Sequence, residues 1–161
     1  MTLTAKSIFT LLLTLLLYFS VTSSSSLQNL LQSQGLPAGL FPNNVESYTF
    51  DYQTGRLEVY LESSCLAKFD GRVYFSSVVR ASLSYGGLMG LEGIAQEELF
   101  LWLPVKGIIV DDPSSGVILI DIGLAQKQLS LSLFEDPPVC KPQGALLEIV
   151  GRKMGSSQVQ Q

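Results

Sequence analysis

The chain has 161 residues, 10 of them basic and 14 acidic, for a formal net charge of −4, and it contains no histidine. The lack of histidine excludes Ser–His–Asp and Cys–His nucleophilic sites, together with histidine-ligated zinc or iron. Lysine and arginine form no cluster of the kind that binds phosphate groups, so nucleic acids and anionic membrane surfaces are disfavoured as partners.

The first 23 residues have the pattern of a signal peptide. Lys6 precedes an apolar run of 14 residues from Ile8 to Val21, and Val21 and Ser23 are small enough for cleavage after Ser23. A membrane-spanning helix needs about 20 apolar residues, so the run is short for a permanent anchor. We predict a signal peptide over residues 1–23 and entry into the secretory pathway, toward the extracellular space or an endomembrane lumen, with no membrane span after cleavage. The alternative is an uncleaved signal that remains as an N-terminal membrane anchor.

Residues 24–140 have the length of one domain with an ordinary hydrophobic core, and residues 141–161 are predicted to form a flexible tail. The two cysteines, Cys65 and Cys140, are expected to form a disulfide bond in the oxidising secretory route. That bond would close a loop of about 75 residues, which contributes roughly 4 kcal/mol in the chain-entropy model. Two buried free thiols are the alternative.

A short helix is expected at the start of this domain. We expect Ser26 to cap it, Leu27, Leu30 and Leu31 to form its apolar face, and Gly35 to end it. Two turns of helix are too short to be stable alone, so this element must pack on the rest of the domain.

From Val45 onward the sequence has the alternation and the turn signals of short strands. Turns are expected at Thr54–Gly55, at Asp70–Gly71 and across residues 111–116. The expected strands are residues 45–52, 57–61, 73–83, 99–103, 108–110, 117–122 and 129–133. Seven to eight short antiparallel strands with one packed helix predict an all-β fold, either a single small β-barrel or a sandwich.

Two apolar stretches lack this alternation. Residues 88–93 follow a strand break at Gly86–Gly87 and are interpreted as a crossing punctuated by glycine. Residues 99–103 are apolar throughout, which is typical of a strand covered on both faces. Pro104 then bends that strand or places it at a sheet edge.

Few residue patterns in this chain are suited to catalysis. The glycines of residues 86–93 lack the spacing of a dinucleotide or phosphate loop. Glu97–Glu98 and Asp111–Asp112 are adjacent pairs, and adjacent side chains on a strand point to opposite faces. A serine with Lys68 or Lys106 as its base, or a carboxylate pair assembled from different strands, remains an alternative. We assign no catalytic residue, and we expect no metal site, no cofactor and no nucleic-acid partner.

Large aromatic residues on apolar strands ordinarily fill a core. Some of them are also candidates for lining an apolar cavity, because the mouth of a small barrel is where such folds hold ligands. Residues 36–41 would then act as a flap over that mouth. The candidate ligand-binding residues are Tyr48, Tyr52, Phe75, Tyr85, Phe100 and Trp102.

Several ordered motifs are similar to those of a plant family. They are residues 36–42 (LPAGLFP), 55–59 (GRLEV), 98–105 (ELFLWLPV), 110–113 (VDDP) and 137–140 (PPVC). The chain resembles, over about residues 27–140, the family called domain of unknown function 538. The resemblance implies a plant source, a single mostly β, barrel-like domain and frequently a signal peptide. It brings no catalytic residues, and a likeness of the family to lipid-binding defence proteins of the bactericidal/permeability-increasing type has been suggested. The family commonly has a basic residue near the position of Glu97, where this chain departs from it.

The leading hypothesis is a non-enzymatic module of the secretory route that binds an apolar or amphipathic, lipid-like small molecule. An ester hydrolase with a Ser–Lys or carboxylate site is one alternative, and a protein-interaction domain is another. An enclosed cavity larger than a few water molecules would favour the first hypothesis, and an exposed apolar patch would favour the interaction domain.

Overall fold

The computed structural model describes residues 23–142. Residues 1–22 and 143–161, which hold nearly all of the predicted signal peptide and of the predicted tail, lie outside the described residues. The helices are α2 (Ser23–Ser33) and the 3₁₀-helices η1 (Pro113–Ser115) and η2 (Leu131–Phe134). The strands are β1 (Val45–Phe50), β2 (Arg56–Leu61), β3 (Cys65–Lys68), β4 (Arg72–Ser84), β5 (Gly87–Glu98), β6 (Leu101–Pro104), β7 (Gly107–Ile109), β8 (Val117–Asp121), β9 (Gln126–Ser130) and β10 (Lys141–Pro142).

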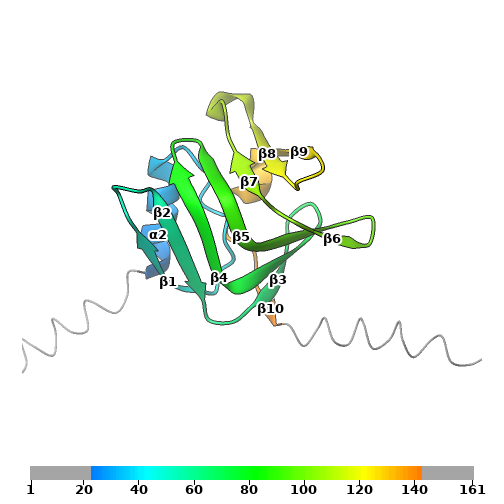
Figure 1. Cartoon of the computed structure of the whole chain (residues 1–161), viewed down its shortest axis with the longest axis horizontal. Helices are drawn as coiled ribbons and strands as arrows, with labels where there is room; N and C mark the ends of the chain where they lie inside the picture. The colour runs from blue at the N-terminus through cyan, green and yellow to red at the C-terminus, as the bar shows by residue number, and fades with distance from the viewer. Residues whose placement is uncertain (1–22, 143–161) are drawn as a thin grey trace, which may run out of the picture.

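Two long strands, β4 and β5, form the centre of one antiparallel sheet (Figure 1). Near the turn that joins them, β2 and β7 flank the pair, and the strand order is β1-β2-β4-β5-β7-β8-β9. Toward their other ends, β3 and β6 take those places, and β10 lies beside β3. The predicted all-β fold with one short helix is confirmed. The sheet is strongly curved but is not closed into a barrel.

Glycine bulges produce part of this curvature, and they correct one prediction. Residues 88–93 are the first half of β5 and not a crossing. Gly90 and Gly93 have φ angles of 59° and 93°, and the β4–β5 register shifts twice between Phe75 and Ser82. A residue with positive φ inserted into an antiparallel pair bends the strand without ending it. The strand break predicted at Gly86–Gly87 is the β4–β5 turn, and Gly90 and Gly93 bend β5 where the sequence pattern indicated a crossing.

Helix α2 lies against the sheet beside β1 (Figure 1). Leu27, Leu30 and Leu31 are buried, as predicted. Gly35 ends the helix with φ +72°, and the Leu36 amide donates to the Leu31 carbonyl at 2.9 Å, which is the Schellman arrangement. The helix is already formed at Ser23, three residues before the predicted cap.

Residues 36–41 are part of the core and do not form the expected flap. Leu36, Leu40 and Phe41 are each 3% exposed. Because these side chains fill the space between α2 and the sheet, the segment is held in place by burial. The extended connection that its prolines impose carries apolar groups into the interior.

The predicted disulfide bond between Cys65 and Cys140 is present, with a Cα–Cα distance of 5.5 Å across 75 residues. It joins β3 to the segment that leads into β10. Lys141 and Pro142, which the sequence placed in the tail, pair with Leu66 and Cys65. Disulfide and strand pairing thus attach the C-terminal end of the described chain to the sheet edge.

The hairpin predicted around residues 111–116 is confirmed, and the last strand, predicted over residues 129–133, begins and ends three residues earlier than expected. Strand β9 ends at Ser130, and residues 131–134 form η2 instead of continuing the alternation. The Ser130 side chain caps η2 by accepting from the Ser132 amide at 3.3 Å. Phe134 is thereby turned into the core. Within the described residues, no helix has both the length and the apolar character needed to cross a membrane.

Gly39 provides a test of this packing. Its amide donates to the Phe134 carbonyl at 2.8 Å, and a Cβ at Gly39 would lie 2.6 Å from that carbonyl oxygen and against the backbone of Asp136. We expect Gly39→Ala to lower the free energy of unfolding by about 1–3 kcal/mol, because backbone cannot give way to the added methyl group. Urea denaturation measures this change. Gly71→Ala is the control, since its Cβ would meet the Glu97 carbonyl oxygen at an ordinary 3.6 Å; equal stability of the two variants would contradict the packing argument.

Candidate functional site

A two-residue turn between β5 and β6 is the most unusual backbone feature of the described chain. Glu98 and Leu101 are the last cross-strand pair, so Leu99 and Phe100 alone form the turn. Their φ angles are 48° and 68°, and no other non-glycine residue of the described chain has a positive φ. A hairpin turn with positive φ at both central residues ordinarily uses Asn–Gly, and it is an outlier for bulky side chains.

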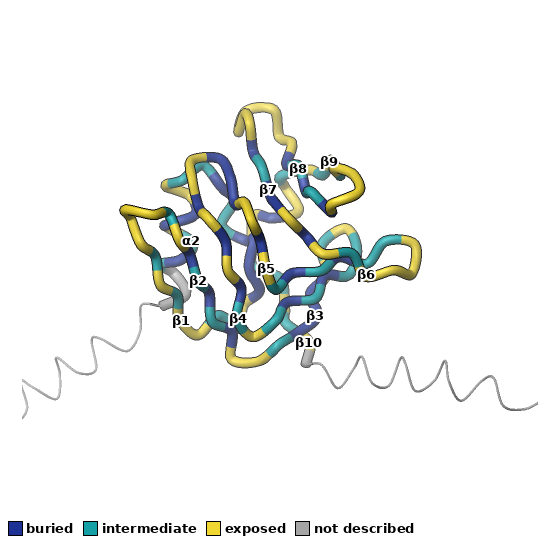
Figure 2. Tube along the Cα trace, viewed as in Figure 1, coloured by how far each residue is buried: buried dark blue, intermediate teal, exposed yellow. Residues whose placement is uncertain are grey.

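This turn and the start of β6 are exposed to solvent (Figure 2), and their residues are large and apolar. Leu99 is 89% exposed, Phe100 84%, Leu101 63% and Trp102 38%. We call residues 99–102 the hairpin tip. The prediction that residues 99–103 form a strand covered on both faces is wrong, because β6 pairs with β5 alone among the described strands and three of its four residues are exposed. Pro104 lies at the end of this edge strand, in agreement with one of its two predicted roles.

Ion pairs hold the base of the hairpin on both faces. Arg72 on β4 donates from Nε and one terminal nitrogen to the two carboxylate oxygens of Glu97, each at 2.5 Å. The Arg72 guanidinium also lies 5.8 Å from the centre of the Trp102 ring. The hydrogen bond to Glu97 raises the pKa of Arg72, against the lowering effect of burial. This fork-like contact fixes the orientation of the hairpin relative to β4.

Lys127 of β9 connects two further elements at this place. Its ammonium group contacts Glu98 at 2.6 Å and Asp70, in the β3–β4 turn, at 3.1 Å. Partial burial lowers the pKa of Lys127, but the bonds to Glu98 and Asp70 outweigh that effect and raise the pKa above its ordinary value. Glu97 and Glu98 therefore contact different cationic side chains, as expected for adjacent residues of a strand, whose side chains point to opposite faces.

An apolar slot, whose lining includes Asp70 and Gln96, lies close to these charged groups. Gln96, which is 3% exposed, is the one buried polar side chain of residues 26–141, and it donates to Glu98 at 2.7 Å. The slot has a volume of about 30 Å³, enough for about two water molecules. Phe69 stacks on Phe134 with 4.6 Å between ring centres and fills much of the space. The apolar residues that line the slot are Leu40, Phe69, Val73, Phe75, Ile94, Val105, Ile108, Ile120, Leu129 and Phe134.

The six aromatic residues predicted to bind a ligand do not come together. Phe75 lies in the core and lines the slot, and Tyr48 is half-buried on β1. Tyr52 is exposed in the β1–β2 turn, and Tyr85 is exposed in the β4–β5 turn, where its ring packs near Gly35. Phe100 and Trp102 belong to the hairpin tip. The side chains separate because they come from turns and strands at different edges of the curved sheet.

Three hollows of the described residues are larger than the slot, and none of the three is lined by these aromatic residues. One, of about 140 Å³, lies between α2 and residues 41–45, and a second, of about 300 Å³, is a depression beside Gly35 and Val110. The third, of about 250 Å³, lies beside Arg56 and Arg80. Within the described residues, no three histidine, cysteine or carboxylate side chains lie close enough to hold a metal ion.

The carboxylates and lysines considered for hydrolysis have other places in the fold. Asp112 accepts from the Ser114 amide at 2.8 Å and caps η1, while Asp111 is exposed beside it. Lys68 and Lys106 are exposed at the end of β3 and before β7. Asp112 therefore has a structural role, and Asp111, Lys68 and Lys106 are exposed to solvent.

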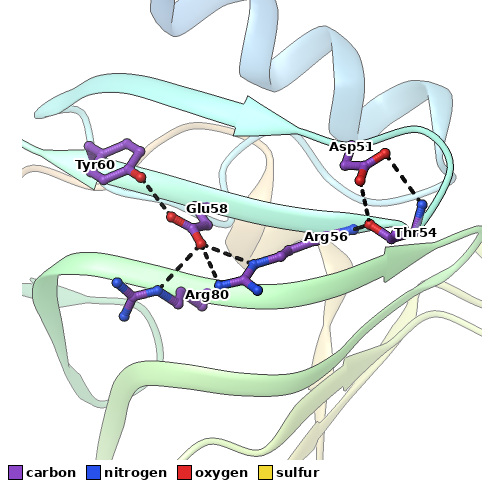
Figure 3. A network of polar contacts seen from close by, with 6 residues as sticks. All are labelled: Asp51, Thr54, Arg56, Glu58, Tyr60 and Arg80. Carbon is purple, nitrogen blue, oxygen red and sulfur yellow. Dashed lines mark hydrogen bonds and ion pairs between the residues drawn. The ribbon is translucent and has the colours of Figure 1, made fainter.

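A polar network on the outer face of β2 and β4 is a feature that the sequence analysis missed (Figure 3). Glu58 accepts from Arg56 at 2.7 Å and from the Tyr60 hydroxyl at 2.6 Å, and Arg80 lies 3.5 Å away. These hydrogen bonds, that from Tyr60 first and that from Arg56 second, lower the pKa of Glu58. The alternation of residues 56, 58 and 60 on one strand face was the signal that could have revealed this network. Because Arg56, Tyr60 and Arg80 already contact the Glu58 carboxylate, we interpret the network as an interaction that stabilises the pairing of β2 with β4.

The fold and the candidate site define a small all-β domain with a projecting apolar hairpin and a filled interior. The chain belongs to the family described as Protein of unknown function, DUF538, whose sequence model matches residues 27–135. It is similar to an uncharacterised protein of Arabidopsis thaliana, with 34% identity over 87 residues. That similarity covers 53% of this chain and 51% of the relative, so the matched region spans about half the length of that protein.

The Glu58 network provides a test of acid sensitivity. Because the folded-state pKa of Glu58 is lowered from 4.5, its stabilising contribution is present above that pH and is lost as the pH falls through the lower folded value. We expect the stability difference between wild type and Glu58→Gln to shrink as the pH falls from about 6 to about 3. Urea denaturation across this pH range measures it. Tyr60→Phe, which removes the largest cause of the lowered pKa, should weaken the same dependence, and a pH-independent difference for Glu58→Gln would refute the assignment.

Proposed function

We propose that the protein is a non-enzymatic binding domain that contacts an apolar or amphipathic, lipid-like partner through the hairpin tip. The observation that carries this proposal is the Leu99–Phe100 turn. Two bulky apolar residues adopt positive φ there, and more than four fifths of each residue's surface is exposed.

The turn is costly for the fold in two ways. Left-handed backbone conformation costs an L-residue with a side chain roughly 1–2 kcal/mol, and Asn–Gly would form the same turn with little of that cost. Exposed leucine and phenylalanine also forgo the gain from removing apolar surface from water. Strained and exposed apolar groups of this kind mark surfaces that bind a partner.

The comparison of cavity and surface favours binding outside the molecule. The apolar slot has room for about two water molecules, far less than a hydrocarbon chain requires. The hairpin tip, in contrast, presents four consecutive large apolar residues. The slot is too small to be the enclosed cavity that would favour a small-molecule site, and the exposed hairpin tip is the apolar patch expected of an interaction surface. We therefore place the apolar or amphipathic, lipid-like partner outside the molecule, as a surface that contacts the hairpin tip. No contact of the described residues gives specific support to the hydrolase alternative.

The location that we propose is the extracellular space or an endomembrane lumen. The disulfide bond between Cys65 and Cys140 supports it, because such bonds persist mainly in oxidising compartments. The predicted signal peptide supplies the route.

A variant with the ordinary turn sequence separates folding from binding. We expect Leu99→Asn/Phe100→Gly to raise the free energy of unfolding by about 1–2 kcal/mol, because the new residues suit a left-handed turn. The same variant should lose most of the fluorescence that the wild type induces in the amphipathic dye anilinonaphthalene sulfonate. Urea denaturation and dye titration of the full chain measure the two effects.

Val139→Ser is the matched control, since Val139 is an exposed apolar residue beside β10, on the sheet edge opposite β6. It should bind the dye as the wild type does. Equal dye fluorescence from wild type and the turn variant would show that the hairpin tip is not the binding surface.

A further inference from the structure

The charges around the hairpin base indicate what kind of surface the tip can approach. Three cationic side chains, Lys68, Arg72 and Lys127, stand near three anionic ones, Asp70, Glu97 and Glu98. Arg72 pairs with Glu97, and Lys127 pairs with both Glu98 and Asp70. The base is therefore close to electrically neutral. The whole chain carries a net charge of −4, which opposes approach to an anionic surface.

The dimensions of the tip suit shallow insertion. Leu99 and Phe100 lie side by side in the turn, so each extends one residue beyond the last cross-strand pair, which is about 3.4 Å of backbone, and its exposed side chain adds to that reach. Apolar groups of interfacial elements enter a bilayer by only about 5–10 Å, so a short tip is sufficient. The headgroup region still contains water and polar groups, so the turn backbone can be hydrogen-bonded there, which the hydrocarbon core would not allow.

Trp102 occupies the position that marks the boundary of such an insertion. It pairs across the hairpin with Glu97, and the Arg72 guanidinium lies over its ring at 5.8 Å. Tryptophan is enriched where lipid meets water because its ring is apolar and its N–H is polar. The apolar turn thus lies farthest out, and an amphipathic ring and paired charges follow behind it.

The geometry of β6 disfavours a second protein strand as the occupant. Strand β6 has four residues and ends at Pro104, which has no amide hydrogen to offer a neighbour. A short edge that ends in proline is a feature by which proteins avoid strand addition. The apolar side chains at the tip, and not the strand edge, are what this region presents.

We propose that the hairpin tip docks into the headgroup region of a lipid bilayer of no net charge, with Leu99 and Phe100 inserted and Trp102 at the boundary. This inference rests on the proposed function and names its partner. Docking of this kind is reversible, because only the turn is inserted and the charged base stays in water. Anionic lipid adds nothing to it, since the base offers balanced charges.

The chain contains a single tryptophan, so its emission reports on the hairpin tip alone, whatever the rest of the full chain binds. With phosphatidylcholine vesicles we expect a blue shift of Trp102 emission, and quenching by lipids brominated near the headgroup. Leu99→Asn/Phe100→Gly should lower the partition coefficient at least tenfold, and Val139→Ser should behave as the wild type. Vesicles enriched in phosphatidylserine should bind no more tightly.

Three results would overturn the inference. If Trp102 emission is unchanged with vesicles while dye binding depends on the turn, the bilayer is not the partner, and the proposed binding role of the hairpin tip is retained. A shift of Trp102 emission that follows protein concentration without lipid, and that the turn variant abolishes, would assign the surface to a second copy of the chain. Stronger binding to phosphatidylserine would refute the neutral-surface argument.

Discussion

The pairing of β4 with β5 is the interaction on which the rest of the structure depends. These two strands run the length of the sheet, and each changes its outer neighbour halfway along, from β2 to β3 on one side and from β7 to β6 on the other. Gly93, whose φ is 93°, lies against the Val78 carbonyl where the change occurs. A straight pair would give a flat sheet. The bent pair encloses α2 and the core on its concave side and carries the β5–β6 hairpin beyond it.

The interior and the hairpin differ in how their apolar groups are used. In the interior, aromatic rings such as Phe69 and Phe134 stack and leave a slot of about 30 Å³. At the hairpin, leucine and phenylalanine are exposed on a backbone that disfavours them. Arg72 and Lys127 bind the base of this hairpin to β4 and β9, so the exposed turn projects from an anchored support. Preorganisation of this kind reduces the entropy lost when a surface binds its partner.

Much of the fold could be predicted from local patterns, while the candidate site could not. Alternation identified the hairpin of β1 and β2, and Gly35 marked the helix end through its left-handed conformation. The hairpin tip was misread as a covered strand because its turn lacks the glycine or asparagine that signals one. The six candidate ligand-binding residues share only their aromatic character. Their positions depend on the order of the strands in the sheet, which the sequence pattern does not give, and that order places them at different edges.

The sequence by itself determined the all-β class, the helix that packs on it, the turns at Thr54–Gly55 and Asp70–Gly71, and the two cysteines available for one bond. These follow from side-chain period and from backbone preferences, which act between neighbours along the chain. Only the tertiary structure decided that residues 88–93 bend a strand and that residues 99–102 are exposed. The hydrophobicity of a side chain gives the free energy that its burial would contribute, but it does not determine whether another element packs over it. Strand β6 is exposed because β7 pairs with the other half of β5, and no strand of the described residues pairs with the outer edge of β6.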